Sequence, residues 1–178
     1  DFCRNATAVI CSSVEQEMVI KKFNNNTSVI LDSHEEIPFI DSSTNRVDSV
    51  TLSQILWEGQ PATVGGINPI SSILSELSKK YKLHLNLITD QKYYKLLNRY
   101  FEGETVNHLG SDFHKTPGLF SIVPWTPTNL SDFARESHVA IIPINLSVPM
   151  QALKPENRLL IMWRLGLPCL TSASPAYI

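Results

Sequence analysis

The chain alternates apolar segments of strand length with amphipathic segments of helix length, and this alternation restricts its fold more than any other feature. The expected strands are residues 49–59, 83–89, 119–125, 138–144 and 167–173, and the expected helices are residues 68–80, 90–101, 128–137 and 155–165. The strands are continuously apolar, which is typical of strands covered on both faces. The pattern predicts the α/β class: a Rossmann-like parallel sheet with helices on both faces.

The first part of the chain has a different character. The text "ATAVICSSVEQEMVIKKF" predicts a strand followed by a helix, and "TSVILDSHEEI" predicts a second strand and an acidic loop. Residues 38–48 are polar and rich in turn formers, as a linker is. We therefore expect residues 1–45 to be the end of an N-terminal domain with its linker, and residues 46–178 to be the Rossmann-like domain.

Charge and cysteine content exclude several classes of protein. The formal net charge of −2 provides no overall attraction to nucleic acid or to an anionic membrane, so any anion site must be local. No apolar run is long enough for a membrane-spanning helix. The three cysteines, Cys3, Cys11 and Cys169, lack CxxC spacing, so neither a disulfide framework nor a zinc site is expected, and a reducing cytosol is the simplest setting.

Ligands of open parallel sheets bind at the carboxyl ends of the strands. One such end is "ATVGGIN", where the backbone amides of Gly65, Gly66 and Ile67 precede a helix that we expect Asn68 to cap at its N-terminus. These amides suit a phosphate at the positive end of a helix dipole, although a plain turn has the same pattern. A second end is "VPWTPTN", where Trp125 offers a ring for stacking on a base or sugar, or simply packs the loop.

Two positively charged side chains lie where the helix expected at residues 155–165 begins. Pro155 is expected at the first helical position, which places Lys154 and Arg158 four residues apart on one face, with Asn157 beside them. Two cations are unfavourable at a helix N-terminus unless an anion is bound there, so they indicate a phosphate site. The alternative is a solvated turn with Glu156 as the counter-charge.

One cluster of acidic residues and histidine needs separate consideration. "DSHEE" includes His34 and has the composition of a metal or acid–base cluster, but it lies in the connector before the main domain. We therefore expect no metal site.

The order of these segments resembles the C-terminal nucleotide-sugar-binding domain of GT-B type glycosyltransferases. The resemblance is carried by "ATAVICSSVEQE", "ILWEGQPATVGG", "LHLNLITD", "IVPWTPTNLSDFARESHVAIIPI" and "KPENRLLIMWRLGLPCLTSASPAY". It implies one half of a GT-B architecture and transfer of a sugar from a nucleotide-sugar to a glycan or glycolipid acceptor. The nucleotide-sugar is then a substrate, and no further cofactor is implied.

The resemblance also implies donor contacts at particular positions. Gly65 and Gly66 face the diphosphate or sugar, Trp125, Thr126 and Thr128 meet the base, Asn145 lines the sugar site, and Lys154, Asn157 and Arg158 face the ribose-diphosphate. The family commonly has two glutamates where this chain has Leu153 and Ile161, and the basic pair after the first strand is absent from "EGQPATVGG". No catalytic residue is assigned.

Two other functions fit the same sequence. One is a nucleotide-sugar epimerase of the same architecture, and the other is a noncatalytic Rossmann-like interaction module. Under the preferred interpretation the partners are a nucleotide-sugar and a glycan or glycolipid, with no nucleic acid. A cytoplasmic location is expected, and peripheral association with the inner face of the membrane through a second domain is compatible with it.

Overall fold

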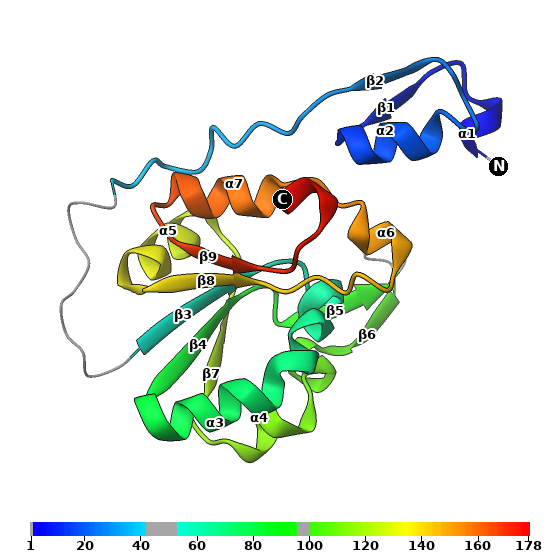
Figure 1. Ribbon diagram of the computed structural model, residues 1–178. Helices are drawn as coiled ribbons and strands as arrows, with labels where there is room; N and C mark the ends of the chain where they lie inside the picture. The colour runs from blue at the N-terminus through cyan, green and yellow to red at the C-terminus, as the bar shows by residue number, and fades with distance from the viewer. Residues whose placement is uncertain (1, 42–52, 96–99) are drawn as a thin grey trace.

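The computed structural model describes residues 2–41, 53–95 and 100–178 (Figure 1). At its centre is a five-stranded parallel sheet with the strand order β7-β4-β3-β8-β9. Its strands are β3 (Ser53–Glu58), β4 (Leu83–Ile88), β7 (Phe120–Val123), β8 (Val139–Ile142) and β9 (Cys169–Thr171). The predicted Rossmann-like parallel sheet is confirmed.

Helices cover both faces of this sheet, as predicted. On one face lie α5 (Pro127–Glu136) and α7 (Asn157–Arg164), and on the other lie the 3₁₀ helix η1 (Pro61–Ile70), α3 (Ser71–Tyr81) and α4 (Ser111–Lys115) (Figure 1). Because successive strand side chains alternate, Leu56 packs in the core on the α5–α7 side, whereas Ile55 and Trp57 pack on the opposite side. The sheet therefore separates two hydrophobic cores.

The strand order contains a topological switch next to β3. The chain adds β4 and β7 on one side of β3, and it then crosses over to add β8 and β9 on the other side. In open parallel sheets the crevice at such a switch, beyond the carboxyl ends of the strands, is where ligands bind. The ends of β3 and β8 are therefore the first place to look for a site.

The helix expected at residues 90–101 is absent, and this prediction is wrong. The chain forms the antiparallel strands β5 (Lys92–Lys95) and β6 (Tyr100–Glu104) instead, while residues 96–99 lie outside the described part. Tyr93 packs edge-on against His108 at 4.4 Å between ring centroids, and Tyr94 packs against Phe101 at 5.6 Å. Tyr94 and Phe101 are direct partners across the two strands, and an aromatic cross-strand pair of this kind favours strands over a helix.

Asn68 does not cap the helix that follows it, contrary to expectation. Pro61–Ile70 is a 3₁₀ helix, and α3 begins only at Ser71. The Asn68 side chain instead links distant segments, because its Nδ2 donates to the His108 carbonyl (3.0 Å) and its Oδ1 accepts from the Gly110 N–H (2.7 Å).

Replacing Asn68 tests this link. We expect Asn68→Ala to lower the free energy of unfolding by about 1–3 kcal/mol, because two backbone groups lose a side-chain partner. The measurement is urea unfolding. Asn129→Ala is the matched control, since it removes one solvent-exposed hydrogen bond to the Pro124 carbonyl. Equal losses in the two variants would show that the Asn68 link is unimportant.

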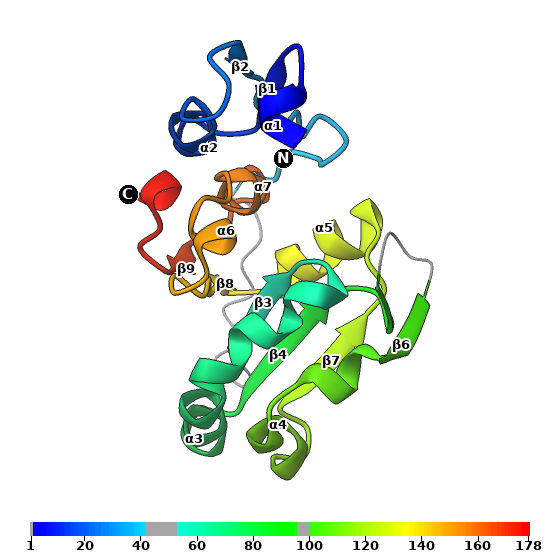
Figure 2. The same ribbon diagram turned by 90° about the vertical axis from the view of Figure 1, so that its right-hand side faces the viewer.

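The N-terminal part forms a small unit of its own. It contains α1 (Phe2–Asn5), β1 (Val9–Cys11), α2 (Val14–Ile20) and β2 (Thr27–Val29), and β1 and β2 pair in parallel. Figures 1 and 2 show this unit beyond α7, on the side away from the sheet. No described helix is long and apolar enough to cross a membrane.

The segment after β2 runs back along the main domain. Ile37 and Ile40 are buried in the core on the α7 side, and the Ile40 N–H donates to the Arg164 carbonyl (2.9 Å). The boundary predicted between residues 45 and 46 lies outside the described residues. Ile37 and Ile40, which precede it in the chain, belong to the packing of the main domain.

The remaining short elements complete the path of the chain. They are η2 (Thr105–His108) before α4, α6 (Pro149–Ala152) between β8 and α7, and η3 (Pro175–Tyr177) after β9. Both α6 and η3 lie close to the carboxyl ends of the strands, so they contribute to the site described next.

Candidate functional site

A cavity of about 370 Å³ lies at the topological switch of the sheet. The end of β3 and the start of η1 form one wall with Glu58, Gln60 and Gly66, and Pro143 and Ile144 after β8 form the next. The turn after α6 contributes Lys154, the first residues of α7 contribute Asn157 and Arg158, and η3 contributes Tyr177. Its location is the one expected for a ligand site in this fold.

Arg158 and Glu58 form an ion pair inside this cavity. Their Nε and Oε2 atoms are 3.5 Å apart, and the side chains are only 19% and 12% exposed. The guanidinium also lies over the Trp57 ring, at 5.1 Å from the centroid. Trp57 is 1% exposed, so the arginine rests on a fixed surface.

The ion pair leaves hydrogen-bonding capacity unused. Arg158 Nε and Nη2 and Glu58 Oε2 are buried without a hydrogen-bond partner within the described residues. Buried donors of a charged group are normally satisfied, so unsatisfied ones point to a missing ligand or water. An oxyanion is the natural partner for a guanidinium in this state.

Burial shifts the pKa of each charged side chain that lines the cavity. It raises the pKa of Glu58 above its usual value, against the opposing effect of Arg158 and of a hydrogen bond from Trp125. It lowers the pKa of Arg158, against the attraction of Glu58. Perturbed groups that converge in a cleft are typical of functional sites.

Lys154 adds a second positive charge to the cavity. Burial lowers the pKa of its ammonium group, and repulsion from Arg158 lowers it further. The cavity thus holds two cations and a single carboxylate among its lining residues. This excess of positive charge suits an anion with more than one negative charge.

The expectation that Lys154 lies in the first turn of the helix is wrong. The α7 helix begins at Asn157 with Glu156 at the N-cap, so Pro155 precedes the helix. The Lys154 N–H donates to the Gln151 carbonyl (3.2 Å) in the turn after α6. Lys154 and Arg158 nevertheless line the same cavity.

The two glycines behave differently from each other. A Cβ atom on Gly66 would lie 3.3 Å from the Pro143 carbonyl, so a small residue lets η1 approach the end of β8. Gly65 faces Asn68 and the His108 carbonyl instead. Both lie inside η1, not ahead of a helix N-terminus, so the expected cradle of free amides is not formed there.

The other expected donor contacts are spread over the same edge of the sheet. Trp125 follows β7, and its side chain donates a hydrogen bond to the Glu58 carboxylate beside the cavity. Thr126 is the N-cap of α5 and accepts from the Asn129 N–H (2.9 Å), and Thr128 is exposed in that helix. Asn145 is exposed and its Oδ1 accepts from the Ser147 N–H and hydroxyl.

The structure therefore brings together Gly66, Lys154, Asn157 and Arg158 as lining residues, with Trp125 close by. Gly65, Thr126, Thr128 and Asn145 are not among the lining residues. The sequence analysis assigned no role to Glu58, Gln60, Gln151 or Tyr177. The sequence did contain a signal for Glu58, because it is the charged residue at the carboxyl end of the first expected strand of the main domain, residues 49–59.

The segment containing "DSHEE" also reaches this site. The Asn157 side chain donates to the Asp32 carboxylate, and the charge of His34 acts on Glu58 to lower its pKa. His34 Nε2 is buried without a hydrogen-bond partner within the described residues. No group of His, Cys, Asp and Glu side chains in the described part is arranged to hold a metal ion.

Comparison with known proteins provides no assignment. No protein-family model matches this chain, and no curated protein matches its sequence significantly. The functional argument therefore depends on the site itself.

Proposed function

We propose that the domain binds the diphosphate of a nucleotide-sugar and acts as the donor-binding half of a glycosyltransferase of the GT-B type. The observation that supports this most is the cavity at the switch of the sheet, where Lys154 and Arg158 converge with unused donors. The acceptor in this proposal is a glycan or glycolipid, held against the donor with the help of a second domain.

The two cations suit a leaving diphosphate. When the sugar is transferred, its bond to the diphosphate oxygen breaks and that oxygen keeps the electron pair. The acceptor oxygen bonds to the sugar carbon, and the proton of its hydroxyl passes to water. Negative charge therefore grows on the diphosphate, where fixed positive groups stabilise it. The Arg158 guanidinium matches two phosphate oxygens at once, and Lys154 acts as a point charge.

Glu58 has a supporting role in this proposal. Its carboxylate compensates the charge of Arg158, and a bound diphosphate would take over part of that compensation. Its raised pKa makes proton uptake by Glu58 easier when a dianion arrives, which limits the repulsion between carboxylate and phosphate.

We also infer a reducing, cytoplasmic setting, with attachment to the inner face of a membrane through the second domain. All three cysteines are free thiols. Burial raises the pKa of Cys169 to about 11, so this thiol resists oxidation.

Replacing Lys154 tests the proposed function. We expect the protein to bind inorganic pyrophosphate, UDP and GDP in isothermal titration, and Lys154→Met to weaken pyrophosphate binding about 10–100-fold, because a charge-assisted contact is lost. Lys79→Met is the matched control, since Lys79 is exposed near the end of α3 and lies outside this cavity.

The same variant has an opposite effect on stability. Because the pKa of Lys154 is lowered in the folded state, its charge costs stability below that pKa, and the cost disappears only as the pH rises to the value for the unfolded chain. We therefore expect Lys154→Met to raise the melting temperature at pH 7, by about 2–4 °C per kcal/mol recovered. Absence of binding by the unaltered protein to all three ligands would contradict the proposed function.

A further inference from the structure

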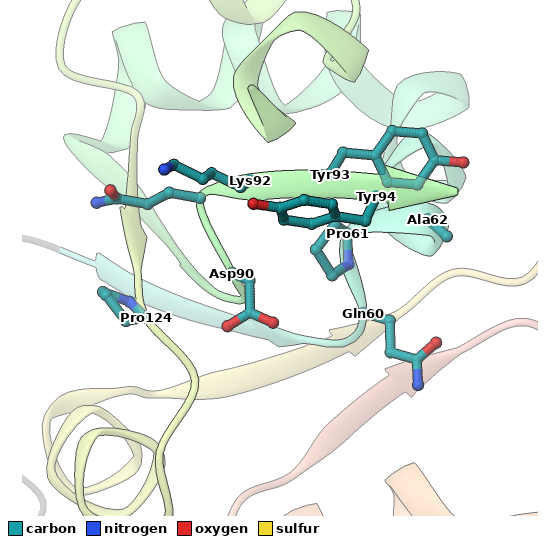
Figure 3. Close-up of a pocket in the computed structure, with 9 residues that line it drawn as sticks. Gln60, Pro61, Ala62, Asp90, Lys92, Tyr93, Tyr94 and Pro124 are labelled. Carbon is teal, nitrogen blue, oxygen red and sulfur yellow. The ribbon is translucent and has the colours of Figure 1, made fainter. Parts of the chain in front are cut away.

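A second cavity, of about 550 Å³, opens on the same edge of the sheet (Figure 3). It lies where β3, β4 and β7 end, next to the β5–β6 hairpin. Its lining includes Gln60, Asp90, Gln91, Tyr93, Tyr94 and Pro124. Gln60 also lines the diphosphate cavity, so the two cavities are neighbours.

The polar wall of this cavity is held in place from behind. Thr105 is fully buried, its hydroxyl donates to the Asp90 carbonyl (2.6 Å), and its N–H donates to the Gln91 carbonyl (2.7 Å). On the hairpin side, Tyr93 is fixed by its contact with His108. The wall is therefore preorganised, as a binding site requires.

The side chains combine an aromatic surface with several polar groups. Tyr94 is 38% exposed and leaves ring surface open, and Figure 3 shows the Asp90 carboxylate near it, with Pro124 and Gln60 on either side of Asp90 in that view. A carboxylate accepts hydrogen bonds, and a carboxamide both donates and accepts. Sugars have the complementary arrangement, because each ring has an apolar C–H face and an edge of hydroxyl groups.

We propose that this cavity binds a sugar residue of a glycan, with its C–H face on Tyr94 and its hydroxyl groups bonded to Asp90 and Gln60. The role of that glycan as acceptor rests on the proposed function, because the shared Gln60 places the bound sugar beside the donor diphosphate. The charged residues of the lining are Asp90 and Lys92, which point away from each other (Figure 3), so this cavity has no excess of positive charge that would favour a phosphate. The chemistry therefore fits a neutral hydroxylated ligand better than a nucleotide.

The test is saturation-transfer NMR and titration of the full chain with maltohexaose, cellohexaose, chitohexaose and mannohexaose. We expect at least one of them to bind, and both Tyr94→Ala and Asp90→Asn to weaken that binding about ten-fold. The matched control is Tyr100→Ala, because Tyr100 is 63% exposed on the same hairpin and is not among the cavity-lining residues. This control should bind the oligosaccharide as the unaltered protein does.

Three results would overturn the proposal: no binding of any of the four oligosaccharides, an equal loss in Tyr100→Ala, or weaker UDP or GDP binding in Tyr94→Ala with unchanged oligosaccharide binding. The last result would place the nucleobase in this cavity. Pyrophosphate titration on the same samples keeps the two proposals separate. If the unaltered protein does not bind pyrophosphate, only the donor site is contradicted, and if it does not bind any oligosaccharide, only the glycan site is contradicted.

Discussion

Arg158→Met should lower the free energy of unfolding by about 3–5 kcal/mol at pH 8. The substitution removes the guanidinium that compensates Glu58, while the carboxylate stays only 12% exposed. A buried carboxylate without its partner bears its full desolvation cost, and the methionine can still pack on Trp57. Urea unfolding at fixed pH measures the loss.

The loss should depend on pH in a defined direction. Burial raises the pKa of Glu58, Arg158 opposes this, and removal of Arg158 therefore raises that pKa further. A carboxyl group whose pKa is raised in the folded state destabilises the fold once it ionises. The stability of Arg158→Met thus falls as the pH rises from about 4.3, the value for the unfolded chain, through the raised folded value.

Two further variants separate the charge effect from packing. Glu58→Gln combined with Arg158→Met should recover most of the lost stability at pH 8, because the buried charge is gone, yet it should still fail to bind pyrophosphate. Arg135→Met, at an exposed arginine in the last turn of α5, should change stability by less than about 0.5 kcal/mol. A deficit that is the same at pH 4.5 and pH 8, or that persists in the double variant, contradicts this account.

The sheet could be predicted because its cause is local. Strands covered on both faces are mostly apolar, and β8 (Val139–Ile142), with four apolar residues of which three are buried, shows that pattern in the sequence itself. The hairpin could not be predicted in the same way. Two contacts stabilise it: Tyr93 packs against His108, which lies outside the segment, and Tyr94 packs against Phe101, which it meets only after the chain has turned back.

The candidate site was predictable to a similar degree. Arg158 and Lys154 could be identified from the sequence, because two cations near a helix N-terminus indicate a bound anion. Their position after an expected strand is enough to place them at the carboxyl edge of the sheet. Glu58 is 100 positions from Arg158 in the chain, and their pairing appears only when β3 and α7 pack together. Asn68 was assigned to a helix cap because its sequence neighbours allow one, whereas its actual partners are 40 and 42 residues away.

Trp57→Ala should have an equally large effect on stability, about 3–5 kcal/mol, for a different reason. Trp57 is 1% exposed and belongs to the core between the sheet and the helices η1, α3 and α4. Its removal leaves a cavity that these neighbours fill only partly. It also removes the ring under Arg158, so we expect weaker pyrophosphate binding, measured by titration alongside urea unfolding.

The control for this variant is Trp163→Ala on α7. Trp163 is 57% exposed, so its truncation should change the free energy of unfolding by no more than about 0.5 kcal/mol. Trp57→Phe should lose less stability than Trp57→Ala and should keep part of the aromatic surface under Arg158. The expected order of stability is therefore Trp163→Ala, then Trp57→Phe, then Trp57→Ala, because the buried area that is removed increases in this order. If pyrophosphate binds Trp57→Ala as tightly as the unaltered protein, the tryptophan supports only the core, and Arg158 is positioned by Glu58 alone.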